Sequence, residues 1–74
     1  MTTALPVSCV LQIGEVAGIV WQVLSEQGPL GMTKLVKAVG KPRDTVMQAL
    51  GWLAREDKIN IEDKGRNRIV SLRQ

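Results

Sequence analysis

The 74-residue sequence predicts a single α+β domain with three helices and a small antiparallel sheet that includes a C-terminal β-hairpin. Three observations predict it. Apolar residues recur every three or four positions in three segments, glycine or proline interrupts the pattern between them, and apolar and polar residues alternate after about residue 58. A hydrophobic content of 45% with 23% charged residues suits one folded domain of this length.

The first helix is expected over residues 11–27, where apolar residues share one face: Ile13, Val16, Ala17, Val20 and Leu24. Residues 1–10 show no helical period and are expected to form an irregular or extended arm, which leaves residues 11–74 as the domain. Gly28 and Pro29 end the helix, because glycine accepts the left-handed capping conformation and proline cannot continue the hydrogen-bond ladder.

Two shorter helices are expected next, after a short strand or bridge at Leu30 and Gly31. The second helix should run from about Met32 or Thr33 to Val39, with Thr33 placed to cap an exposed amide and Gly40 at its end. Pro42 suits the first turn of the third helix, where its missing N–H has no partner. The third helix should turn Val46, Leu50 and Leu53 inward, with Trp52 and Thr45 on a shoulder and an outward face made of Asp44, Gln48, Gly51 and Arg55.

A hairpin is expected from the alternating segment Lys58-Ile59-Asn60-Ile61-Glu62 onward. A two-residue turn at Lys64 and Gly65 would pair Asp63 with Arg66, Ile61 with Arg68, and Ile59 with Val70. The core face would then hold Ile59, Ile61, Val70 and Leu72. A longer loop over residues 63–67 is the alternative.

The net charge of +3 is unevenly distributed along the chain. All ten lysines and arginines lie at position 34 or later, so residues 1–31 carry a net −2 and residues 32–74 a net +5. The second and third helices and the hairpin therefore hold the positive charge, a distribution typical of nucleic-acid-binding domains.

The residue types that are absent argue against catalysis. The chain has no histidine and a single cysteine, Cys9, so no internal disulfide and no His/Cys metal cluster is possible. No pairing of nucleophile and base is evident either, so we expect no enzyme, cofactor, metal or small-molecule ligand. Cys9 is expected to be an inert thiol, with an intermolecular disulfide as the alternative. No apolar run approaches the length of a membrane span, and a cytoplasmic location is expected.

The segment ALGWLAREDKI at residues 49–59, with Ile13-Gly14-Glu15 near the start of the first helix, resembles a small prokaryotic family of winged helix-turn-helix proteins of unknown function. The resemblance covers residues 11–72. That family supplies no established active-site or DNA-contacting residues to carry over. The wider winged helix-turn-helix class implies that the third helix enters a major groove and that the hairpin, the wing, contacts phosphates or a minor groove.

The leading functional hypothesis is a nucleic-acid-binding protein, a transcription-regulator-like DNA binder without catalytic activity. Arginine can recognise guanine and glutamine can recognise adenine, while basic wing residues neutralise phosphates. The candidate contact residues are Arg43, Gln48 and Arg55 on the third helix and Lys64, Arg66 and Arg68 in the wing. A solvated basic surface with no ligand is the alternative explanation of these residues.

The second hypothesis is a protein-interaction or dimerisation module that docks through Trp52 and Gly51. It is motivated by Asp44 and Gly51, which interrupt the basic outward face of the third helix. Trp21 and Trp52 are the only aromatic residues, and each either closes an edge of the core or meets a partner. The four-residue spacing of Gly14 and Gly18 would allow packing of the arm or self-association.

Overall fold

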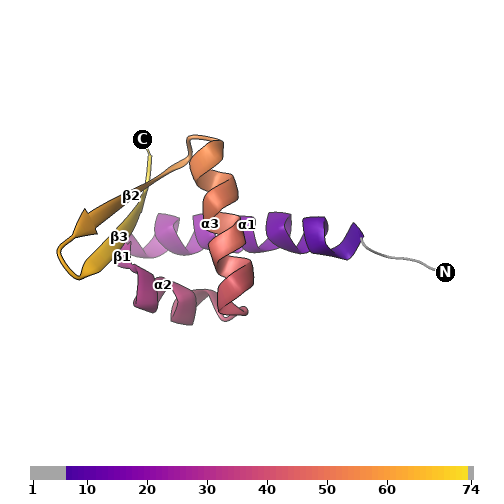
Figure 1. Ribbon diagram of the computed structural model, residues 1–74, viewed down its shortest axis with the longest axis horizontal. Helices are drawn as coiled ribbons and strands as arrows, with labels where there is room; N and C mark the ends of the chain where they lie inside the picture. Colours follow the sequence, from indigo (N-terminus) through magenta and orange to yellow (C-terminus); the bar gives the residue numbers. More distant parts are fainter. Residues whose placement is uncertain (1–6, 74) are drawn as a thin grey trace.

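The computed structural model describes residues 7–73, with side chains from Cys9 onward, as three helices and a three-stranded antiparallel sheet. The elements follow in the order α1 (Val7–Gln27), β1 (Leu30–Gly31), α2 (Met32–Val39), α3 (Arg43–Arg55), β2 (Ile59–Lys64) and β3 (Asn67–Leu72). Helix α3 crosses the middle of α1, so the N-terminal part of α1 projects away from the sheet (Figure 1). The expected α+β fold is confirmed.

Helix α1 begins at Val7, four residues before its expected start. The prediction that residues 7–10 are irregular is therefore wrong, whereas residues 1–6 of the expected arm, with Leu5 and Pro6, lie outside the described residues. The apolar periodicity did not predict this first turn of the helix, and the reason is physical. A helical period records burial on one face, and this end of α1 has little to pack against, since Val10 and Leu11 are 68% and 59% exposed.

Glycines end the first two helices as expected. Gly28 has φ 80° and donates its N–H to the Leu24 carbonyl at 2.9 Å, and Gly40 has φ 71° and donates to Val36 at 3.2 Å. The predicted cap by Thr33 is wrong, because Gly31 takes the N-cap position of α2 and no side chain bonds there. Pro42 is the N-cap residue of α3, one position before the expected first turn.

The hairpin turn lies one residue later than expected, at Gly65 and Arg66. Lys64 pairs with Asn67 and Ile61 with Val70, so the predicted pairing of Ile61 with Arg68 is wrong. Gly65 has φ 65° and takes the first of the two turn positions, the position where a type II′ turn favours glycine. The expected turn would have placed a lysine at that position.

The register error left the faces of the hairpin unchanged, because every pairing partner moved by two residues and side chains alternate with a period of two. Ile59 and Val70 are buried as expected and Leu72 is half-buried, while Ile61 shares their face but is 42% exposed near the tip. Strand β3 lies in the centre of the sheet, between β2 and β1, where Val70 also pairs with Leu30.

The buried core of the described residues is entirely aliphatic. It joins all three helices to the sheet and consists of Val16, Ala17, Val20, Leu24, Leu35, Val39, Val46, Ala49, Leu50, Leu53, Ile59 and Val70. Both tryptophans remain about half exposed, Trp21 at 48% and Trp52 at 52%. The core thus fixes α2, α3 and the hairpin side by side without using either aromatic residue.

Candidate nucleic-acid interface

A basic groove of about 800 Å³ runs between α2, the start of α3 and the wing. Helix α2 and the residue before it contribute Gly31, Met32, Thr33, Lys34 and Lys37; α3 contributes Arg43 and Met47; and the wing contributes Arg66, Asn67, Arg68 and Ile69. Five of these side chains are basic and none is acidic. Segments far apart in the sequence thus build one cationic surface.

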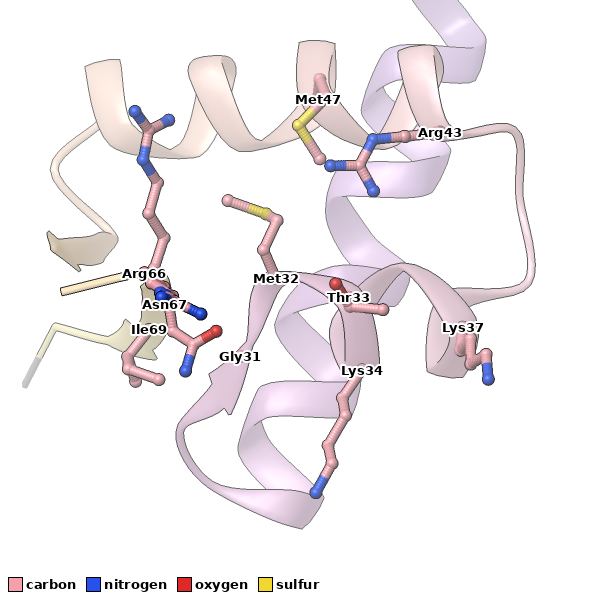
Figure 2. A pocket seen from close by; sticks show the side chains of 11 residues that line it. Gly31, Met32, Thr33, Lys34, Lys37, Arg43, Met47, Arg66, Asn67 and Ile69 are labelled. Carbon is pink, nitrogen blue, oxygen red and sulfur yellow. The ribbon is translucent and has the colours of Figure 1, made fainter. Parts of the chain in front are cut away.

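The centre of the basic groove is apolar and its sides are cationic. Figure 2 shows Arg43 and Arg66 on opposite sides, with the thioethers of Met32 and Met47 between them. Met32, Met47 and Ile69 are half-buried, so their remaining surface forms the floor of the groove. Lys34 and Lys37 extend outward from α2 at the edge of the same groove (Figure 2).

Local structure explains how these cations come together. Arg43 is the first residue of α3, because Gly40 ends α2 and Pro42 starts the next helix. Lys34 and Lys37 are three residues apart and lie together on the exposed side of α2, which turns Leu35 into the core. Arg66 is at the tip of the wing because Gly65 places the turn there.

Two wing cations already have carboxylate neighbours. The Arg68 Nε donates to Asp63 Oδ1 at 3.2 Å, and Lys64 Nζ lies 3.9 Å from Glu62 Oε1. Both pairs are exposed, and such pairs contribute only about 0 to 1 kcal/mol. Within residues 9–73, the other four groove cations have no carboxylate oxygen within 4.0 Å: Lys34, Lys37, Arg43 and Arg66.

The structure brings together half of the six candidate nucleic-acid contacts. Arg43, Arg66 and Arg68 line the basic groove, whereas Lys64 lies outside it on the wing. Gln48 and Arg55 are exposed on α3 as expected but also lie outside the groove. Sequence reasoning missed Lys34, Lys37 and Asn67; the exposed position of both lysines on the second helix was the available signal.

Asp44 is the one carboxylate in the first turn of α3. Its Oδ1 accepts a hydrogen bond from the Thr45 N–H at 3.0 Å, and the side chain is exposed. A carboxylate at this end of a helix is favoured by the positive end of the helix dipole. The position of Asp44 therefore suits the start of α3, and Asp44 does not line the basic groove.

The two candidate partner-binding residues lie in different surroundings. Trp52 lines a second groove, of about 560 Å³, together with five residues of α1: Val10, Leu11, Ile13, Gly14 and Glu15. We call this the apolar groove. Gly51 is exposed on α3 outside the apolar groove. Within the described part of the chain, and apart from its neighbours and its own helix backbone, no atom lies within 4 Å of where a Cβ would stand.

Other kinds of site find little support. Among residues 7–73, no group of three or more His, Cys, Asp or Glu side chains is arranged to hold a metal ion. The helices in this part of the chain are also too short or too polar to cross a membrane. Cys9 is an exposed free thiol near the start of α1.

Helices α2 and α3 with the following hairpin define a winged helix-turn-helix domain. The chain belongs to the family described as Winged helix-turn-helix domain (DUF2582), whose model matches residues 9–72. This confirms the resemblance drawn from residues 49–59.

Two relatives agree with this family assignment. The uncharacterized protein MJ1608 of Methanocaldococcus jannaschii is 33% identical over 64 residues, which cover 84% of this chain and 91% of the relative. The solution NMR structure of protein BT2368 from Bacteroides thetaiotaomicron is similar with a TM-score of 0.74 and 33% identity, over 82% of this chain and 74% of that one. Neither name states a ligand or an activity.

Proposed function

We propose that the protein binds duplex DNA through the basic groove, as a transcription-regulator-like domain without catalytic activity. The observation that carries this proposal is the convergence of five basic side chains, from α2, α3 and the wing, on one groove that no carboxylate lines. A polyanion that touches all three elements neutralises more of this charge than a small anion held by one of them.

In the proposed complex, a DNA backbone lies along the basic groove and α3 enters the major groove. Arg43 and Arg66, on opposite sides of the groove, contact phosphates of that backbone. Gln48 and Arg55 on the exposed face of α3 then meet base edges, with the Gln48 amide suited to adenine and the Arg55 guanidinium to guanine.

The wing loses little free energy when it exchanges its own ion pair for contacts with DNA. Binding requires Arg68 to exchange the Asp63 carboxylate for a phosphate, and the exposed Arg68–Asp63 pair is worth only about 0 to 1 kcal/mol. Lys64, held beside Glu62 and outside the groove, contributes less than Arg66 in this arrangement.

The test is a titration of labelled duplexes of varied sequence at several salt concentrations. Each phosphate contact contributes a slope of about −0.9 in log K against log salt, so five contacts give a slope of about −4 to −5. The Arg43→Ala, Arg66→Ala double variant should bind more weakly and reduce the slope by about 2.

The matched control is Lys58→Ala combined with Arg73→Ala, which removes the same charge from the chain. Both residues are exposed and lie outside the basic groove, Lys58 beyond the C-terminal end of α3 and Arg73 at the end of β3, where it donates to Asp57 Oδ1 at 2.7 Å. Equal weakening by both double variants would mean that net charge, not the groove, drives binding. An absence of binding to any duplex at low salt would contradict the proposal altogether.

A further inference from the structure

Helix α1 carries a second apolar stripe on the side away from the core. Leu11, Gly14, Gly18 and Trp21 are all exposed and follow one another at spacings of three, four and three residues. This spacing places them on one face of a helix and is the spacing of a coiled-coil seam. The core-facing residues of the same helix, such as Val16 and Val20, occupy a separate face. We call the four exposed residues the α1 stripe.

The α1 stripe has a symmetric arrangement of sizes. Its large residues, Leu11 and Trp21, lie at the ends, five positions on either side of residue 16. Its small residues, Gly14 and Gly18, lie in the middle, two positions on either side of the same point. In an antiparallel pair related by a two-fold axis, positions equidistant from the axis face each other, because the same patch is used by both subunits.

We propose that the α1 stripe binds a second copy of this chain, with the two α1 helices antiparallel and the two-fold axis passing near residue 16. Leu11 then faces Trp21 of the second copy, and Gly14 faces Gly18 of the second copy. This inference does not depend on DNA binding, since the basic groove is built by other elements.

The local geometry suits this pairing. Among residues 7–73, and apart from the adjacent residues and the nearby backbone of α1, no atom lies within 4 Å of where a Cβ would stand on Gly14 or Gly18, so the helices can approach closely at the centre. Toward one end of the α1 stripe, the apolar groove between Leu11 and Trp52 is open to receive an indole ring. Trp21, 48% exposed, supplies a ring of this kind from the second copy.

Charge opposes a contact between two copies less on α1 than on the basic groove. Within residues 7–33 the only ionised side chains are Glu15 and Glu26, whereas every lysine and arginine follows later. A two-fold contact through α1 therefore brings no basic surfaces together. The same contact through the basic groove would place five cations against five.

The tryptophans alone supply about a third to a half of the area that a specific interface needs. A buried aromatic side chain covers about 150 to 250 Å². Trp21 and Trp52 are each about half exposed, so the four tryptophans of the two copies supply about 300 to 500 Å². A specific interface needs roughly 1,000 Å² in total. Val10 and Leu11 of each copy, both more than half exposed, lie in the same apolar groove and add to this area.

Sedimentation equilibrium of the full chain, from low micromolar to millimolar concentration, tests the proposal. We expect a monomer–dimer equilibrium. Leu11→Glu and Trp21→Lys should each weaken dimerisation about tenfold or more. The chain with both changes should recover much of the loss, because the new carboxylate of one copy would face the new ammonium group of the other. Gly18→Gln should also weaken dimerisation about tenfold or more while keeping the helix, since glutamine is a better helix former than glycine.

The matched control is Ile61→Lys, which places a charge on a similarly exposed apolar residue of the wing and should leave the dimer unchanged. Circular dichroism checks that each variant remains folded. A strictly monomeric chain at millimolar concentration would overturn the proposal, as would a dimer that withstands both Leu11→Glu and Gly18→Gln. Recovery that fails in the double variant would overturn the antiparallel register.

Discussion

At the scale of single residues, glycine is required at the end of α2 but not inside α3. Gly40 has φ 71° at the end of α2, a conformation that side chains with a Cβ rarely adopt. Gly51 lies inside α3 with open space around it, so nothing about its surroundings requires glycine. The same substitution should therefore have opposite effects at the two positions.

Gly51→Ala should raise the free energy of unfolding by about 0.5 to 1 kcal/mol, because alanine loses less backbone freedom in a helix. Gly40→Ala should lower it by about 1 to 2 kcal/mol through left-handed strain. Urea denaturation followed by far-ultraviolet circular dichroism measures both. Destabilisation by Gly51→Ala would mean that another molecule packs against the backbone at residue 51.

Leu35 is fully buried where α2 meets the rest of the core. Leu35→Ala should cost about 2 to 5 kcal/mol through lost burial and the cavity left behind. A domain of this length has only roughly 4 to 11 kcal/mol of stability, so the denaturation midpoint should fall steeply. Val10→Ala, measured in dilute solution, is the control, because this exposed valine should change stability by less than about 0.5 kcal/mol.

At the scale of elements, the wing depends on where its turn forms. Gly65→Ala places a Cβ at φ 65°, which costs about 1 to 2 kcal/mol at the tip of an exposed hairpin. We expect faster amide hydrogen exchange across residues 61–68 with little change in the core. Arg66→Ser removes a cation, keeps Gly65 and adds no backbone freedom, so its hairpin should exchange at the rate of the unchanged protein. Equal exchange in both variants would contradict the requirement for glycine at residue 65.

The turn also shows what the sequence could and could not predict. Gly28 and Gly40 identified the helix ends because the residue that adopts the left-handed conformation there is most often glycine. At Gly65 the same reasoning left two positions for the glycine within a two-residue turn, and the wrong one was preferred. The start of α1 was missed because Cys9, Val10 and Leu11 are exposed, so no buried face imposes a helical period on the apolar pattern there.

The basic groove could be predicted only in part for a related reason. Arg43 and Arg66 stood out because they flank a helix start and occupy a hairpin tip. Lys34, Lys37 and Met47 join them through the packing of α2 and α3 against the wing, a tertiary relation that no local pattern records. Conversely, Gln48 and Arg55 are exposed on α3, as the helical period predicts, but they lie outside the basic groove. The period separates exposed from buried positions and does not show which exposed positions line the groove.

At the scale of the whole molecule, positive charge is concentrated in the basic groove, while the N-terminal half of α1 lies beyond α3, away from the wing (Figure 1). Five cations around one groove repel one another in the free protein, and salt screens that repulsion. The melting temperature should therefore rise with added sodium chloride.

The increase in melting temperature with salt should be smaller in the Arg43→Gln, Arg66→Gln double variant than in the unchanged protein. It should persist in the Lys58→Gln, Arg73→Gln double variant, which carries the same net charge. Differential scanning calorimetry at several salt concentrations makes the comparison. Identical salt dependence in the two variants would mean that the cations of the groove do not interact appreciably in the folded domain.

The aliphatic core has a practical consequence for following this protein in solution. The intrinsic fluorescence of the protein comes from two indoles, Trp21 and Trp52, that already contact water in the native domain. Thermal unfolding should therefore change the emission maximum only slightly, and circular dichroism is the better reporter of folding. Any association that covers α1 or the neighbouring shoulder of α3 should instead shift the emission to shorter wavelength, so this protein reports its own assembly without an attached dye.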